Sequence, residues 1–81
     1  MFYELFWEGY NTFVNKFCNT FEKTVEIAKQ YTKDENFLYT HDLTNGCIIN
    51  KYELDVETGM YNITEQYEYD ADTDELNKMK I

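Results

Sequence analysis

The chain has 81 residues, of which 15 are aromatic, and its 16 acidic residues and seven lysines give a net charge of −9 at pH 7. It contains no serine, no arginine and no proline, which excludes a serine nucleophile and an arginine clamp for phosphate groups. The negative charge also argues against direct binding to nucleic acid or to a membrane of anionic lipid, since both require a cationic surface.

High net charge with low hydropathy is typical of disorder, but the aromatic content and clear periodicities predict one folded domain over residues 1–81. Residues 1–10, MFYELFWEGY, form an aromatic N-terminal segment. It lacks a basic region and is too short and acidic for a signal peptide or a membrane span, which favours a cytoplasmic protein. We expect part of it to cover the core and part to bind a partner or a second copy. Trp7 is the candidate anchor, because tryptophan is enriched at binding hot spots.

Residues 11–33 are predicted to form one long helix. Apolar side chains recur there at steps of three and four residues and give a single apolar stripe. Asn11 or Thr12 is suited to cap the start, and Lys29 and Lys33 suit the negative end of the helix dipole. The stripe consists of Phe13, Phe17, Phe21, Val25, Ala28 and Tyr31.

Beyond about residue 36 the apolar period changes to two, which is typical of strands. The segment FLYTHDL is expected to be the first strand, and Asn45-Gly46 and Thr58-Gly59 fit two-residue hairpin loops. Residues 36–81 therefore predict a four-stranded antiparallel β-meander. The expected fold class is α+β, with one long amphipathic helix packed on that meander.

The two predicted hairpins place tyrosines and aliphatic side chains on one face of the meander and acidic side chains on the other. Glu65 is the exception, because it falls on the apolar face unless it lies at the margin near Lys80 or a bulge turns it outward. The acidic face would form spaced rows that continue into a hairpin tip. The rows and tip consist of Glu53, Asp55, Glu57, Glu68, Asp70, Asp72, Asp74 and Glu75.

Charge is segregated along the chain. Residues 53–75 contain nine acidic residues and no lysine, whereas the rest of the chain has seven of each and is neutral. This segregation favours a basic partner for the acidic face. The alternative is a solvated surface that keeps a small protein in solution.

The acidic stretch also has part of a calcium-binding pattern. Asp70, Asp72 and Asp74 have the spacing of the first three ligands of an EF-hand loop. Glu75 stands where that loop requires glycine, and Ile81 stands where it requires a bidentate glutamate. A hairpin tip explains the aspartates better, through hydrogen bonds from side chain to backbone.

No residue combination indicates catalysis, a cofactor or a metal ion. Cys18, His41 and Cys47 lack the usual zinc-ligand spacings. The predicted register sends His41 to the core face and Cys47 to the outer face, and Cys18 is expected to be a buried helix residue. Carboxylates on an open sheet face lack the cleft that acid–base catalysis needs. The chain is therefore not expected to be an enzyme.

These features predict an acidic inhibitor that binds the basic nucleic-acid-binding surface of a bacterial defence or nucleic-acid-processing protein. In size, charge and lack of catalytic residues, the whole chain resembles small acidic phage-encoded defence inhibitors, the DNA-mimic and anti-CRISPR class. The resemblance implies a partner such as a CRISPR effector in the host cytoplasm, and it involves no sequence motif. The alternative is a structural or partner-binding module, such as an immunity protein, an antitoxin or a small assembly subunit.

Overall fold

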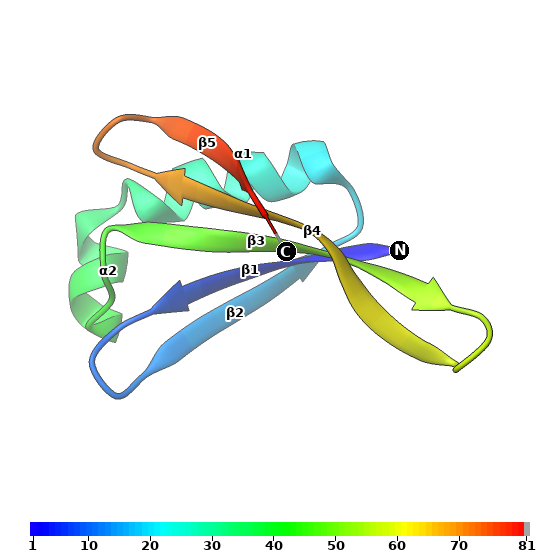
Figure 1. Cartoon of the computed structure of the whole chain (residues 1–81). Coiled ribbons are helices and arrows are strands. Elements are labelled where there is room, and N and C mark those ends of the chain that lie inside the picture. Colours follow the sequence, from blue (N-terminus) through cyan, green and yellow to red (C-terminus); the bar gives the residue numbers. More distant parts are fainter. Residues whose placement is uncertain (81) are drawn as a thin grey trace.

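The computed structural model describes residues 1–80 and contains one antiparallel sheet with two helices on one of its faces (Figure 1). The strand order is β2-β1-β3-β4-β5, so β1 and β3 pair although β2 and both helices separate them in sequence. The strands are β1 (Phe2–Glu8), β2 (Phe13–Cys18), β3 (Gly46–Asp55), β4 (Met60–Asp70) and β5 (Glu75–Met79). The helices are α1 (Phe21–Thr32) and α2 (Glu35–His41).

This architecture corrects the predicted fold, because a five-stranded sheet and two short helices replace one long helix on a four-stranded meander. The helix predicted over residues 11–33 is wrong in its first half, where β2 lies. Phe13 and Phe17 are four residues apart, which fits a helix. With Asn15 between them they also fit one face of a strand, and pairing with β1 selects the strand.

Helix α1 begins at a capped position further along the chain than predicted. Thr20 is the N-cap, and its side chain accepts a hydrogen bond from the backbone N–H of Lys23 at 3.2 Å. The hydroxyl of Thr24 donates to the Thr20 carbonyl at 2.6 Å. Asn11, predicted as a cap, instead has a φ of 55° between β1 and β2, a left-handed conformation that asparagine tolerates.

The aromatic N-terminal segment forms β1, which pairs with both β2 and β3. Tyr3, Leu5 and Trp7 are buried on the side of the helices. Phe2 and Phe6 point to the other side of the strand. Because both faces of β1 carry large apolar groups, the alternation of polar and apolar residues that predicts a strand is weak.

The segment predicted as the first strand of the meander is mostly helix α2. Asp34 caps its start by accepting hydrogen bonds from two backbone N–H groups of the helix at 3.0 and 3.2 Å. Asp42 ends it with a φ of 56°. Asn45-Gly46 is consequently not a hairpin loop; it leads from α2 into β3.

The hairpin predicted around Thr58-Gly59 is present between β3 and β4, but its loop is longer. Residues 56–59 connect the paired ends of the two strands, and Gly59 has a φ of 75°, which glycine adopts readily. Leu54 faces Tyr61 instead of the predicted Ile63. The register at the loop is therefore shifted by two residues.

A one-residue bulge lies in β4 at Thr64. Tyr52 pairs with Ile63, the next residue Lys51 pairs with Glu65, and the register skips Thr64. An extra residue reverses the alternation of side chains relative to the neighbouring strand. Odd-numbered residues of β4 therefore point away from the helices before the bulge and toward them after it.

The core lies between the sheet and the helices. Trp7 is fully buried there, and its Nε1–H donates to Thr32 Oγ1 at 2.9 Å. The Trp7 ring packs edge-on against Phe37, with the ring centroids 5.3 Å apart. Both helices pack on the same side of the sheet, so no element within residues 1–80 covers its opposite side. The buried apolar core consists of Tyr3, Leu5, Trp7, Ala28, Phe37, Cys47, Ile49 and Tyr69.

Candidate protein-binding face

We call the uncovered side of the sheet the open face. Residues paired directly across antiparallel strands point to the same side of a sheet, so the register assigns each strand residue to the open face or to the helix side. The open face is rich in large apolar groups, which marks interaction surfaces more often than solvated ones. Its apolar members are Phe2, Phe6, Phe13, Phe17, Ile48, Tyr52, Leu54, Tyr61, Ile63 and Met79.

Four aromatic rings of the open face form a cluster around Phe2. Phe2 stacks on Tyr52 with centroids 4.9 Å apart and an interplanar angle of 11°. Tyr61 and Phe17 lie against Phe2 edge-on, at 5.1 and 5.9 Å. Phe17 is 60% exposed and Tyr61 is 52% exposed. The rings are thus ordered by mutual contact and still accessible to a partner.

A hydrogen-bonded polar belt crosses the middle of the open face. Glu4 accepts hydrogen bonds from Asn50 Nδ2 at 3.0 Å and from the Tyr52 hydroxyl at 3.1 Å. Asn15 Nδ2 also donates to Glu4, at 3.4 Å, and Gln66 Nε2 donates to Asn50 Oδ1 at 2.7 Å. Burial, together with the bond to Glu4, raises the pKa of Tyr52. The belt joins β2, β1, β3 and β4 and fixes the polar side chains that form it.

Every charged side chain that the strands place on the open face is acidic. The three lysines within strands lie on the helix side, because Lys16 pairs with Leu5, Lys51 with Tyr3 and Lys78 with Tyr67. A molecule that approaches the strands of the open face therefore meets carboxylates and apolar groups, with Lys23 of α1 at the margin, where it lines a hollow with Phe2 and Phe17. The acidic members of the open face are Glu4, Glu8, Glu68, Asp70 and Glu75.

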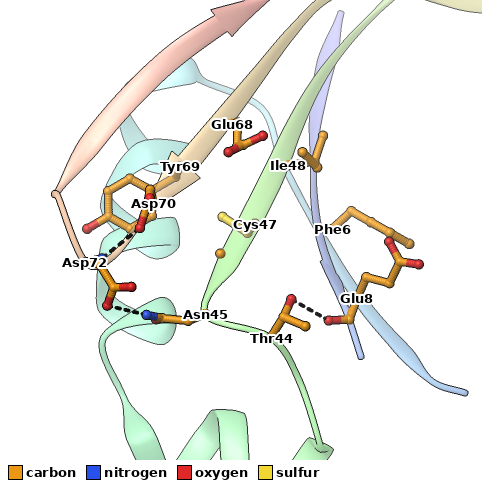
Figure 2. A pocket seen from close by; sticks show the side chains of 11 residues that line it. Phe6, Glu8, Thr44, Asn45, Cys47, Ile48, Glu68, Tyr69, Asp70 and Asp72 are labelled. Atoms are coloured by element: carbon orange, nitrogen blue, oxygen red, sulfur yellow. Dashed lines mark hydrogen bonds between the residues drawn. The ribbon is translucent and has the colours of Figure 1, made fainter. Parts of the chain in front are cut away.

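A hollow of about 370 Å³ lies at the end of the open face where β3 begins (Figure 2). Phe6 and Ile48 give it an apolar wall, and Glu8, Glu68 and Asp70 contribute carboxylates. The hollow is therefore lined, like the rest of the open face, by apolar and acidic side chains.

The predicted acidic residues do not form a single array. Glu53 and Asp55 point to the helix side of the β3–β4 hairpin, whose outer part extends beyond the helices (Figure 1). Glu68 and Asp70 point to the open face. The bulge at Thr64 causes this separation. If β4 continued without a bulge from its pairing near the loop, Glu68 and Asp70 would point to the same side of the sheet as Glu53 and Asp55.

Asp74 holds the β4–β5 turn against the helices. It accepts a hydrogen bond from the Tyr69 hydroxyl at 2.6 Å and forms an ion pair with Lys33 Nζ at 3.1 Å. The bond from Tyr69, and then the contact with Lys33, lower the pKa of Asp74. Burial and the same bond raise the pKa of Tyr69. The other predicted acidic residues are Glu57 in the β3–β4 loop, Asp72 in the β4–β5 turn and Glu75 at the start of β5.

Glu65 lies on the helix side, directly after the bulge. Its carboxylate forms ion pairs with Lys51 at 3.1 Å and with Lys78 at 3.8 Å. It also accepts a short hydrogen bond from the Tyr67 hydroxyl, which contributes most to lowering the pKa of Glu65. The Glu65 carboxylate is therefore neutralised by lysine side chains of the neighbouring strands.

Trp7, the predicted anchor for a partner, lacks the exposure that a surface contact needs, because it is fully buried on the helix side. The accessible aromatic residues of the N-terminal half lie elsewhere. Phe13 and Phe17 on β2 are 59% and 60% exposed, and both belong to the open face. Phe13 and Phe17, not Trp7, are therefore the accessible aromatic candidates for contact with a partner.

The two cysteines and the histidine lie on three different elements. Cys18 is a half-buried thiol on β2, not on a helix, and Cys47 is buried on the helix side, not on the outer face. Burial raises the pKa of Cys47 to about 11, against a smaller lowering by a hydrogen bond with Thr32. His41 is on α2, with Nδ1 2.9 Å from the carbonyl oxygen of Phe37.

Within residues 1–80, no three His, Cys, Asp or Glu side chains gather as a metal site. Neither helix of this part of the chain has the length and apolar character needed to cross a membrane.

The open face was missed because its members come from five strands that only the pairing brings together. One local signal existed in β2, where Phe13 and Phe17 alternate with polar Asn15, as on the exposed side of a strand.

The chain matches no protein-family model, and comparisons with curated proteins and with solved structures find no match.

Proposed function

We propose that the chain is an acidic inhibitor that occupies the basic, nucleic-acid-binding surface of a bacterial defence or nucleic-acid-processing protein. The observation that carries the proposal is unpaired negative charge. Of the nine acidic residues in positions 53–75, only Glu65 and Asp74 form ion pairs with lysine inside the described part of the chain. The other seven carboxylates remain unneutralised there.

Seven unpaired carboxylates within residues 53–75 of an 81-residue chain repel one another and favour neutralisation by a cationic partner. A surface rich in lysine and arginine that normally binds phosphate groups supplies that charge. Electrostatic steering would speed the association, and added salt would weaken it.

In this proposal the inhibitor blocks a basic groove by covering it. It does not reproduce the regular spacing of phosphate groups, because the bulge divides the acidic residues between two sides of the sheet. The proposed compartment is the cytoplasm of a bacterial host, where Cys18 and Cys47 would stay reduced.

The aromatic cluster favours a second candidate, a partner-binding module such as an immunity protein, an antitoxin or a small assembly subunit. Exposed Phe17 and Tyr61 are residue types that contribute strongly to protein–protein affinity. In that case apolar contacts dominate the affinity, salt has little effect, and the partner need not bind nucleic acid.

The test is a pull-down with the tagged chain from bacterial lysate at low and high salt, followed by mass spectrometry of the bound proteins. Each captured protein is then mixed with fluorescently labelled DNA or RNA, and the chain is added as a competitor. The matched control carries Glu53→Gln, Glu68→Gln, Asp70→Asn and Glu75→Gln, which preserve size and remove four charges, three of them on the open face.

We expect a nucleic-acid-binding protein to be captured at low salt, released at high salt and freed of its nucleic acid by the chain, with the amide variant much weaker. Capture that is equally strong at high salt, of a protein with no affinity for nucleic acid, would replace the inhibitor by the second candidate. Capture by the amide variant at full strength would contradict the charge argument itself.

A further inference from the structure

The open face exposes apolar side chains whose burial by a partner would be favourable. Phe13, Phe17, Tyr61 and Leu54 are each between 48% and 60% exposed on it, and neither helix lies on this side of the sheet. Burying such groups is favourable by about 25 cal/mol for each Å² of apolar surface. The aromatic cluster holds Phe17 and Tyr61 in place beforehand, which lowers the entropy cost of binding.

Charge determines which kind of molecule fits the open face. If two copies of the chain met through it, the five carboxylates of each would face those of the other. No lysine lies on the strands of that face to pair with them, since Lys16, Lys51 and Lys78 point to the helix side. Like charges brought together across an interface oppose binding. A second copy is therefore disfavoured as the occupant.

We propose that the open face is the docking surface for a basic protein. This inference rests on the proposed function and specifies which surface of the chain binds the partner. The aromatic cluster around Phe2 packs against an apolar patch of the partner. The hollow receives a lysine or arginine side chain of the partner, with the aliphatic stem against Phe6 and Ile48 and the charged group toward Glu8 and Glu68. Long cationic side chains pack in this way, with an apolar stem and a solvated or paired head.

Two charge variants test whether binding depends on the open face or on the overall charge of the chain. Glu8→Lys with Glu68→Lys reverses two acidic residues of the open face. Glu53→Lys with Glu57→Lys reverses Glu53, which points to the helix side, and Glu57, which lies in the β3–β4 loop beyond the paired residues of the open face. Both variants change the net charge by the same amount, so any difference between them reports on position.

An apolar pair of variants tests the aromatic cluster. Phe17→Thr truncates an exposed ring of the open face and keeps a residue suited to a strand. Tyr39→Gln truncates a more exposed ring, 88% exposed on α2, which lies away from the open face. Far-ultraviolet circular dichroism and thermal melting of each variant establish that it is folded.

Binding is measured to the basic protein that the low-salt pull-down captures. We expect Glu8→Lys with Glu68→Lys, and separately Phe17→Thr, to weaken binding by about tenfold or more. The hairpin charge variant and Tyr39→Gln should each change it by less than about threefold. Equal weakening by the two charge variants, with no effect of Phe17→Thr, would overturn the assignment of the surface and leave the inhibitor proposal standing.

Photo-crosslinking identifies the occupant directly. Benzoylphenylalanine at position 17 should crosslink the captured basic protein in lysate, whereas the same group at position 39 should not. A product at twice the chain mass from position 17 would show that a second copy occupies the face and would overturn this inference. A partner crosslinked only from position 39 would overturn it as well. Failure of the proposed function has a different signature, since then no salt-sensitive basic protein is captured by any variant.

Discussion

Trp7 shows how one side chain joins the two layers of the molecule. Its ring fills the space between β1 and the helices, and its N–H reaches the hydroxyl of Thr32 at 2.9 Å. Both groups are buried, so the Trp7 N–H needs this acceptor to avoid an unsatisfied polar atom. This internal pairing explains why an aromatic residue in an aromatic-rich segment is absent from the surface.

Replacement of Trp7 by Phe removes the donor and leaves the Thr32 hydroxyl without that partner. We expect the free energy of unfolding to fall by at least about 1–3 kcal/mol, the usual cost of an unmet buried hydrogen bond. Because Trp7 is the one tryptophan, urea unfolding should be followed by circular dichroism and not by fluorescence. Tyr39→Phe at an exposed site is the control and should be neutral. Equal stability of both variants would mean that the hydrogen bond contributes nothing.

At the scale of elements, the end of β1 is held by a close approach to the chain that follows α2. Gly9 forms an isolated bridge with Leu43, and a Cβ atom at Gly9 would lie 1.9 Å from the backbone oxygen of Asp42. Backbone on both sides leaves no flexible side chain to move aside. The arrangement of β1 and α2 therefore requires a glycine at position 9.

Gly9→Ala should destabilise the fold by about 3 kcal/mol, because the clash forces β1 and the segment after α2 apart. Gly59→Ala is the matched comparison: its surroundings are empty, and its positive φ of 75° should cost only about 1 kcal/mol. Thermal melting can resolve the difference, since 1 kcal/mol corresponds to roughly 4–8 °C in a domain of this size. A smaller loss for Gly9→Ala than for Gly59→Ala would contradict the close approach.

Elements whose signals are local could be predicted from the sequence, and elements defined by pairing could not. The β3–β4 hairpin was predicted because Thr58-Gly59 provides turn chemistry between alternating segments. β1 and β2 were not, since apolar residues on both sides of β1 hide its alternation and Phe13 and Phe17 also fit a helical spacing. Helix α2 was mistaken for a strand, although Asp34 is well placed as an N-cap.

The candidate site was predictable in composition and not in geometry. The excess of acidic residues in positions 53–75 follows from the sequence alone. Which side of the sheet each acidic residue occupies depends on the bulge at Thr64, and threonine there has no property that demands a bulge. The register of long-range pairing, not local propensity, therefore decides the binding surface.

At the scale of the whole molecule, positive and negative groups are unevenly arranged. The ion pairs of Glu65 with Lys51 and of Asp74 with Lys33 connect strands to each other and the β4–β5 turn to α1. Apart from these contacts, most of the acidic residues beyond position 53 face solvent. The molecule therefore combines local charge pairing that supports the fold with unpaired charge that opposes it.

This arrangement predicts a specific response to acid. The pKa values of Glu65 and Asp74 are lowered by folding, so their contribution to stability is complete above the unfolded pKa values near 4 and is lost as the pH falls through the folded ones. Glu65→Gln with Asp74→Asn removes that contribution. The difference in melting temperature between the original chain and this variant should be largest at pH 6–7 and shrink toward pH 3. A difference that is constant with pH would contradict the two lowered pKa values.

The extra residue in β4 also bears on how such a chain diverges. Inserting one codon between Lys51 and Tyr52 would give Thr64 a partner and exchange the two sides of the outer hairpin. Tyr61 and Ile63 would leave the neighbourhood of Phe2, and Glu53 and Asp55 would come to share a side with Glu68 and Asp70. Removing the codon for Thr64 would instead keep every side chain where it is, because Ile63 and Glu65 already point to opposite sides and would then be adjacent. Among homologues, a residue gained in β3 at this point would thus forecast a change of surface, whereas loss of the residue at position 64 would not.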